Sequence, residues 1–315
     1  MSNCLFCYQP LAANEQDFHA SCSKKIFGQP TPPDLPYSEE DLEPLAKKVI
    51  QSQTSVTGVQ AKLSLHITGN QKEGNERRFT IVGLWGGYLL KPPTALYPQL
   101  PEVEDVTMHL AQLAKIKTAP HCLIRLQSGN LAFVTKRIDR TKNGKLAMED
   151  MCQLTERLTE DKYHGSYEQI AKAIQRHSVT PGLDVVNFFE LVLFSFLTGN
   201  ADMHLKNFSL LEQPGLGMVL SPAYDLVNTA LVHPADEEEM ALTLNGRKKK
   251  LTKQDFVAAM NTLKLEEKQQ EMIFNKMAKA WPQWQELIDR SFMSVEFKEQ
   301  YKSLLKERMN RINQL

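Results

Sequence analysis

The pattern of apolar and polar positions predicts a strand-rich first part of the chain. Short runs of β-branched and aromatic residues predict five strands, at residues 61–67, 79–84, 87–91, 122–126 and 131–138. The polar, glycine-containing segment 69–78 joins the first two runs, which is typical of a hairpin. Apolar residues at near-helical spacing predict one helix over 102–115. We therefore expect a five-stranded sheet that carries one helix.

From residue 147 onward the pattern has the period of helices. It predicts helices at residues 148–158, 167–177, 184–197, 251–264, 266–280, 284–291 and 295–312. Strands first and helices afterwards are typical of an α+β fold with two lobes. We expect a β-rich lobe over 44–140 and an all-helical lobe over 141–315. The cleft between them is expected to run through Lys91, residues 135–138 and the loop around Asp202.

The composition narrows the class of protein. A length of 315 residues with 42% hydrophobic content suffices for one large domain or two lobes with a sizeable core. Lysine plus arginine (37) balance aspartate plus glutamate (37), so we expect no direct nucleic-acid binding and no membrane binding. The N-terminus lacks a signal pattern, and the longest apolar run, 185–197, is too short to span a bilayer. We therefore expect a cytoplasmic protein.

The first 43 residues form a separate segment before the β-rich lobe. Prolines and acidic residues crowd positions 29–43, a composition that does not hold regular structure for long, so this stretch is expected to be a linker. A short helix is predicted after it, over 45–51.

Four residues at the N-terminus have the spacing of a metal site. Five cysteines, an odd number in a chain without an export signal, favour thiols or metal ligands over a disulfide framework. Cys4 and Cys7 form one pair, and His19 and Cys22 repeat its spacing. Two such pairs are what a structural, tetrahedral Zn²⁺ knuckle requires. Cysteines of this kind can also be buried as apolar residues without metal, and the sequence leaves both readings open.

The segment 199–226 carries an acid, an amide five residues later and a second acid after a short hairpin: Asp202, Asn207 and Asp225. The apolar run 185–197 predicts a buried helix that delivers this segment into the interior. Phosphoryl transfer from ATP needs a carboxylate to accept the substrate hydroxyl's proton, and an amide and a second carboxylate to hold Mg²⁺. Asp202 then is the base, and Asn207 and Asp225 are the metal ligands. The alternative is a polar surface loop, because these residue types are turn formers.

Two further segments suit the phosphates of a nucleotide. Residues 54–65 place hydroxyl residues, one glycine and Lys62 at the mouth of a strand, where they can cradle phosphates; the alternative is an ordinary turn. Lys91 ends an apolar strand, as a phosphate-holding lysine does, although strand-end lysines are more often solvated. Glu104 can pair with Lys91 or merely complement the helix dipole.

Together these motifs resemble the HipA-like serine/threonine kinases, the toxin components of bacterial toxin–antitoxin modules. The resemblance covers nearly the whole chain. It rests on residues 55–60, Lys91, 101–104, 135–140, 149–153, 200–209 and 222–225. It implies a bilobal, protein-kinase-like fold with ATP and Mg²⁺ as cofactors.

The resemblance also implies roles for single residues. Asp202 is the catalytic base, and His204 stands where ordinary kinases carry a lysine, unless it is simply a core histidine. Family members silence themselves by phosphorylation of the phosphate loop, which here implies Ser55 and Thr57. Lys136 stands where longer members carry glutamate, so backbone contacts with adenine are expected there. The residues implied in nucleotide binding are Thr57, Gly58, Val59, Gln60, Lys62, Lys91, Glu104, Lys136, Arg137, Ile138, Lys206 and Tyr224.

The resemblance further implies partners. Full-length members carry an additional N-terminal subdomain of about a hundred residues, whereas this chain enters its cysteine-containing segment almost at once. That matches the short HipT type, in which a small HipS-like protein resembling the missing subdomain and a helix-turn-helix HipB-like antitoxin complete the module. The short form implies phosphorylation of the tryptophan aminoacyl-tRNA synthetase on a serine, which would stop translation.

Two rival functions have the same sequence features. A small-molecule kinase of the aminoglycoside or choline type shares an acid followed by histidine at plus two and asparagine at plus five. A catalytically silent kinase-like scaffold would use the lobes for binding only. Intact Lys91, Asp202, Asn207 and Asp225 argue against the scaffold, since a silent protein has no need of all four.

Overall fold

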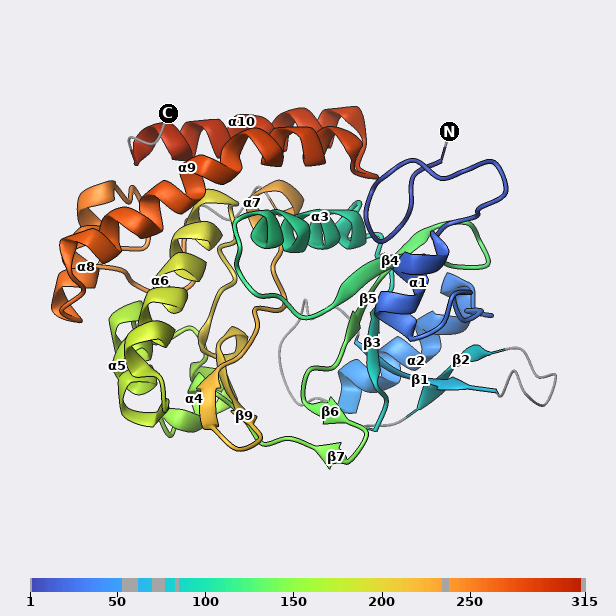
Figure 1. Ribbon diagram of the computed structural model, residues 1–315, viewed down its shortest axis with the longest axis horizontal. Coiled ribbons are helices and arrows are strands. Elements are labelled where there is room, and N and C mark those ends of the chain that lie inside the picture. The colour runs from blue at the N-terminus through green and yellow to red at the C-terminus, as the bar shows by residue number, and fades with distance from the viewer. Residues whose placement is uncertain (1, 53–61, 70–76, 83–84, 234–237, 313–315) are drawn as a thin grey trace. The chain divides into compact units, whose positions relative to one another are not determined.

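The structure is a computed structural model that describes residues 2–52, 62–69, 77–82, 85–233 and 238–312. The chain divides into two compact units (Figure 1). The first unit consists of Met1–Asp105, Ala119–Ile138 and Arg290–Phe292, and the second of Val106–Thr118, Asp139–Asp289 and Met293–Leu315. The domain ranges expected from the sequence, 1–43, 44–140 and 141–315, stay a prediction.

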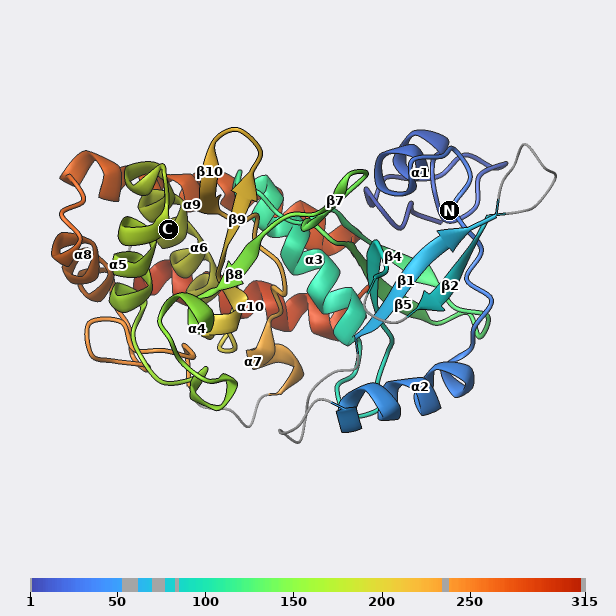
Figure 2. The same ribbon diagram turned by 90° about the horizontal axis from the view of Figure 1, so that it is seen from below.

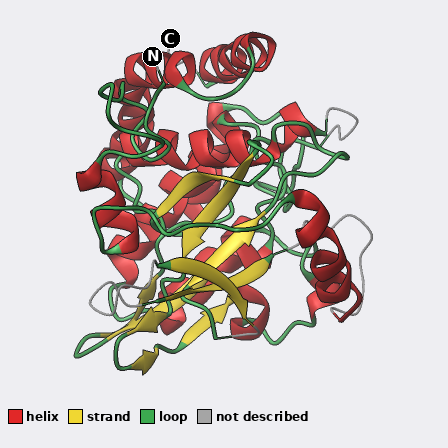
Figure 3. Ribbon diagram, turned by 90° about the vertical axis from the view of Figure 1, so that its right-hand side faces the viewer, coloured by secondary structure: helices red, strands yellow, loops and turns green. Residues whose placement is uncertain are grey.

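The first unit is built on the predicted five-stranded sheet (Figures 1 and 3). Its strand order is β2-β1-β3-β5-β4, and every neighbouring pair is antiparallel. The hairpin of β1 and β2 is confirmed by the pairing of Leu65 with Ile81. The strands are β1 Leu63–Thr68, β2 Arg78–Val82, β3 Tyr88–Lys91, β4 His121–Arg125 and β5 Leu131–Lys136. The predicted helix over 102–115 is α3, Leu100–Leu113.

The N-terminal segment belongs to the core of this unit. An edge-to-face series of buried rings joins α1, Ala20–Phe27, to the sheet: Phe27 lies 5.7 Å from Phe79, and Phe79 lies 5.4 Å from Tyr88, between ring centroids. The Leu123 amide donates to the Leu5 carbonyl at 3.1 Å, which ties the first residues of the chain to β4. Aromatic packing of this kind contributes about 0.5–1.5 kcal/mol per pair beyond burial.

The predicted linker is wrong in its last residues, because helix α2 spans Glu39–Ser52. Its start is fixed by a reciprocal cap: the Ser38 amide donates to the Asp41 carboxylate at 2.8 Å, and the Asp41 amide donates to the Ser38 hydroxyl at 3.3 Å. Three acids in the first turn complement the positive end of the helix dipole. These local signals outweigh the proline content, and Pro44 lies inside the helix.

The second unit is mainly helical (Figures 1 and 2). Its longer helices are α5 Tyr167–His177, α6 Pro181–Leu197, α8 Lys253–Thr262, α9 Glu267–Arg290 and α10 Val295–Arg311, and its short ones are α4 Met151–Leu154 and α7 Thr229–Val232. It also contains strands, so the expectation of an all-helical second part is wrong. Strands β8 Met148–Asp150, β9 Ser209–Gln213 and β10 Gly217–Leu220 form an antiparallel sheet, and β6 Arg140–Thr141 pairs with β7 Gly144–Lys145.

Three predicted helices need correction for local reasons. The helix expected over 148–158 begins only at Met151, because Asp150 ends strand β8 and forms a capping box with Gln153. The helices expected over 266–280 and 284–291 are one helix, α9, with Pro282 inside it. Its buried face continues past the proline, since the fully buried Trp284 packs on Phe194 and donates its indole N–H to the Leu110 carbonyl at 2.8 Å.

In the part of the chain that the structure describes, none of the helices combines the length and the apolar character needed to cross a bilayer.

Candidate functional site

Helix α6 delivers the predicted catalytic segment, as its apolar sequence indicates. The helix is buried along nearly its whole length and is followed by Gly199 in a left-handed conformation, with φ 74°. The Gly199 carbonyl accepts from the Ala230 amide and from the Thr229 hydroxyl, both at 3.1 Å. The same hydroxyl oxygen accepts from the Ala201 amide at 2.8 Å. The chain therefore leaves α6 along one fixed path.

Gly199 is expected to tolerate no side chain. A Cβ there would lie 2.5 Å from Leu304 Cδ2 and 2.7 Å from Asn228 Oδ1. Gly199→Ala should therefore lower the free energy of unfolding by more than the strain of a left-handed residue, about 1–2 kcal/mol. Gly246→Ala is the matched control, because Gly246 has the same φ of 74° and no atom within 4 Å of its added Cβ. Equal losses in urea denaturation would contradict the packing argument.

The loop after Gly199 holds Asp202 and Asn207 in a fixed relation. The Asn207 side chain is buried, and its amide nitrogen donates to the backbone carbonyl of Asp202 at 2.9 Å. This bond uses the nitrogen and leaves the amide oxygen, the atom that Mg²⁺ prefers, available as a ligand. The Asp202 side chain is 50% exposed, so its carboxylate can meet a substrate.

Tyr163 contacts both the Asp202 carboxylate and the His204 ring. The Tyr163 hydroxyl donates to Asp202 Oδ1 at 2.6 Å, and its ring meets the His204 ring edge-on at 5.0 Å. His204 is buried, and burial lowers its pKa despite the nearby carboxylates of Asp202 and Asp225. The imidazole is therefore neutral at neutral pH. Its Nδ1 has no hydrogen-bond partner among the described residues, so His204 is not a fully satisfied core histidine.

The remaining predicted residues of the second unit lie around the same loop. Lys206 Nζ forms an ion pair with Asp150 Oδ2 at 2.7 Å. The Tyr224 hydroxyl donates to the Lys206 carbonyl at 3.1 Å, which joins the loop to the segment that follows β10 and contains Asp225. Asp225 has φ 60°, in the left-handed region that non-glycine residues seldom adopt and that is common at functional sites.

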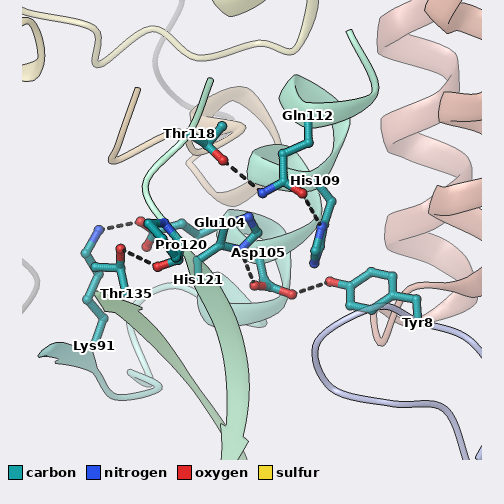
Figure 4. A network of polar contacts seen from close by, with 10 residues as sticks. All are labelled: Tyr8, Lys91, Glu104, Asp105, His109, Gln112, Thr118, Pro120, His121 and Thr135. Carbon is teal, nitrogen blue, oxygen red and sulfur yellow. Dashed lines mark hydrogen bonds and ion pairs between the residues drawn. The ribbon is translucent and has the colours of Figure 1, made fainter. Parts of the chain in front are cut away.

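In the first unit, Lys91 and Glu104 form a buried ion pair (Figure 4). The Lys91 Nζ and Glu104 Oε1 atoms lie 2.5 Å apart, and the side chains are 3% and 0% exposed. The ammonium also lies 5.5 Å from the centroid of the Phe133 ring. Lys91 is therefore not a solvated strand-end lysine, and Glu104 does more than complement a helix dipole. Both alternatives are wrong.

Two of the backbone amides predicted to contact adenine already donate hydrogen bonds within the unit. The Lys136 amide donates to the Pro120 carbonyl at 2.8 Å, and the Arg137 amide donates to the Gly87 carbonyl at 2.9 Å. Because these two amides are used within the unit, neither is available for a backbone N–H contact with adenine. Lys62 is exposed. The other predicted phosphate-loop residues, Ser55, Thr57, Gly58, Val59 and Gln60, lie outside the described residues.

Sequence reasoning missed Tyr163 and Asp150 as members of the site. Tyr163 lies in an irregular segment 39 residues before Asp202, and no spacing rule links the two. Asp150 belongs to the segment 149–153 that supports the family resemblance, but its ion pair with Lys206 spans 56 residues. Contacts of this kind become visible only in the folded chain.

The predicted metal knuckle is assembled in the first unit. The ligand atoms of Cys4, Cys7, His19 and Cys22 all lie within 4.8 Å of one another. All five cysteines of the chain are free thiols, as the cysteine count predicted.

Comparisons with the sequences of known proteins identify a family. Residues 54–285 match the sequence model of the HipA-like C-terminal domain. A protein named "Putative kinase Y4dM" from Sinorhizobium fredii is 32% identical over 234 residues, and one named "Putative kinase" from Haemophilus influenzae is 29% identical over 250. These alignments cover 70% and 73% of this chain, and 55% and 69% of the relatives. The chain thus spans little more than half the length of the first relative.

Solved structures share the fold. HipA from Shewanella oneidensis MR-1, in a toxin–antitoxin complex with HipB and operator DNA, matches 85% of this chain and 70% of its own with a TM-score of 0.66 and 21% identity. The Helicobacter pylori proinflammatory kinase CtkA matches 71% of this chain and 87% of its own, with a TM-score of 0.53 and 18% identity. The predicted kinase-like fold is confirmed. Since the domain match spans most of its length, this chain belongs to the HipA-like C-terminal domain family.

Proposed function

We propose that this protein is a Mg-ATP-dependent serine/threonine protein kinase, the toxin of a toxin–antitoxin module. The observation that carries the proposal is the Asn207 amide fixed on the Asp202 backbone, beside the half-exposed Asp202 carboxylate. A base and a metal-ligating amide held in one short loop are what phosphoryl transfer requires. Relatives named as kinases support this reading.

Each residue then has a chemical task. Asp202 accepts the proton of the substrate hydroxyl, and the Tyr163 hydroxyl, bonded at 2.6 Å, orients that carboxylate. Asn207 and Asp225 would hold Mg²⁺ through their side-chain oxygens, and the ion would supply charge neutralisation at the phosphate oxygens. Lys91 contacts the phosphates while Glu104 holds its ammonium in place. Lys206 reaches the nucleotide only by leaving Asp150, its partner here.

The proposed substrate is the tryptophan aminoacyl-tRNA synthetase, modified on a serine so that translation stops. This rests on the similarity to the short HipT type. The proposed partners are a HipS-like small protein and a HipB-like antitoxin, and the complex of Shewanella HipA with HipB and operator DNA supports the kind of partner. Because ATP and synthetases are cytoplasmic, the proposed site of action is the cytoplasm.

Self-inactivation is proposed at Ser55 and Thr57. A phosphate there adds about −1.5 to −2 charges in the segment proposed to bind the nucleotide's own phosphates, so the two should repel each other. The doubly substituted Ser55→Ala, Thr57→Ala protein lacks both proposed acceptor hydroxyl groups. It should gain no phosphate in this segment after incubation with Mg-ATP. Fragmentation mass spectrometry locates the phosphate, and full phosphorylation at other positions instead would contradict the proposed sites.

The substrate class is tested by incubating the Ser55→Ala, Thr57→Ala protein and Mg-ATP with purified tryptophanyl-tRNA synthetase. A parallel incubation offers a panel of small alcohols that includes choline and an aminoglycoside. Phosphoserine in the tryptophanyl-tRNA synthetase is the expected result, with the glutamyl-tRNA synthetase as the comparison protein. Phosphate only in a small alcohol would replace the proposal with a small-molecule kinase. Phosphate in none of them would favour the silent scaffold.

A further inference from the structure

The Cys/His cluster at the N-terminus has distances that suit a tetrahedral metal site. Cys4 and Cys7 come from the first loop, His19 from the residue before α1, and Cys22 from its first turn. His19 Nδ1 lies 3.4 Å from the Cys7 sulfur and 3.7 Å from the Cys22 sulfur. Around zinc, with bonds of about 2.3 Å to sulfur and 2.0–2.1 Å to nitrogen, the sulfur–nitrogen edge of a tetrahedron is about 3.6 Å. One of the two sulfur–nitrogen distances is slightly shorter than this value, and the other is slightly longer.

The outer contacts of the cluster fix which imidazole nitrogen serves as the ligand. His19 Nε2 lies 3.1 Å from the Pro10 carbonyl and 3.8 Å from the Glu15 carboxylate. A ring whose Nε2–H donates to a carbonyl presents its unprotonated Nδ1 on the other side, which is the side the sulfurs occupy. Second contacts of this kind orient the histidine ligands of metal sites.

The donor set favours a metal site over ordinary buried cysteines. Cys4 and Cys22 belong to the apolar core of the unit, and in addition the sulfurs of Cys7 and Cys22 face the Nδ1 atom of His19. Three thiolates and an imidazole are soft ligands that favour Zn²⁺ over Mg²⁺ or Ca²⁺. We propose that Cys4, Cys7, His19 and Cys22 bind one Zn²⁺ in a closed structural site, with no position left for water or substrate.

The knuckle also positions Tyr8, which contacts Asp105, the residue next to Glu104 in the chain. Tyr8 directly follows Cys7, has φ 59° and is fully buried. Its hydroxyl donates to Asp105 Oδ2 at 2.6 Å, while Asp105 Oδ1 lies 2.7 Å from His121 Nδ1 (Figure 4). Asp105 is the neighbour of Glu104 in α3. Zinc bound to Cys7 would therefore fix the loop that carries Tyr8. Loss of zinc should weaken the contact between this loop and Asp105 in α3.

Metal analysis of the purified full chain tests the site without any need for kinase activity. Atomic emission is expected to find one zinc per chain in the parent protein and in Cys152→Ser, which changes a buried cysteine outside the cluster. Cys7→Ser is expected to hold far less zinc. Tyr8→Phe should keep its zinc, because the hydroxyl is not a ligand. A parent protein purified from zinc-supplemented cells without stoichiometric zinc would overturn the proposal.

Cobalt substitution keeps the test decisive if Cys7→Ser fails to fold. The parent protein, stripped of zinc and refilled with Co²⁺, should show the intense visible bands of a tetrahedral ion and the thiolate-to-cobalt bands of sulfur ligation. Weak bands typical of an octahedral ion with oxygen ligands would overturn the assignment.

Discussion

Asp202→Asn is expected to lower the rate of phosphate transfer by about 10²–10⁴-fold, the usual contribution of a positioned base. The amide cannot accept the proton of the substrate hydroxyl at neutral pH. Its oxygen can still accept from the Tyr163 hydroxyl, which now bonds Asp202 Oδ1 at 2.6 Å, and the side chain is half exposed. The free energy of unfolding should therefore hardly change, and the loss should be one of chemistry.

Initial rates of phosphate transfer at saturating Mg-ATP measure this effect. Glu160→Gln is the control, because it removes an exposed carboxylate from the short helix Thr159–Asp161 in the same unit. The control should transfer phosphate at the parent rate. A parent-like rate in Asp202→Asn would remove Asp202 from the proposed mechanism.

Lys91→Met is expected to damage both stability and nucleotide binding. It removes the ammonium that lies 2.5 Å from Glu104 and leaves that carboxylate buried without this partner. Breaking a buried ion pair from one side typically costs about 3–5 kcal/mol of unfolding free energy. ATP affinity should fall as well, since the phosphates lose their proposed cation.

A double variant separates the two effects. Lys91→Met with Glu104→Leu replaces the whole pair by apolar side chains, an exchange that is often neutral for stability. It should recover most of the unfolding free energy in urea denaturation but none of the ATP binding measured by calorimetry. Lys25→Met, an exposed lysine of α1, is the control and should stay within about 0.5 kcal/mol of the parent. Recovered ATP binding in the double variant would contradict the role given to Lys91.

The parts of the fold that the sequence predicted well are those with a strong local period. Short runs of β-branched and aromatic residues predicted the five strands of the first sheet, and helix α5 has the predicted bounds, where Ser166 forms a capping box with Gln169. The errors occur where one contact outweighs the pattern. Strand pairing with β9 holds Met148–Asp150 extended, and the buried Trp284 face carries α9 past Pro282.

The site was predictable as far as its chemistry depends on spacing along the chain. Asp202 and Asn207 lie in one loop, and their interval is a local property of the sequence. The buried state of Lys91 was not predictable, because a strand-end lysine has the same local sequence whether it is paired or solvated. Tyr163 and Asp150 reach their partners only through folding. The knuckle was predictable only in part. Spacing along the chain indicates the four ligands, but only the structure shows that their donor atoms lie within 4.8 Å of one another.

The central claim is that this loop transfers phosphate from ATP to protein hydroxyl groups. The most direct test incubates the parent protein and Asp202→Asn with isotope-labelled ATP and Mg²⁺, with and without the tryptophanyl-tRNA synthetase. Fragmentation mass spectrometry then locates the label. The account predicts labelled serine or threonine with the parent protein and at least about 100-fold slower labelling with Asp202→Asn. Equal labelling by both proteins, or no protein labelling by the parent, would contradict it.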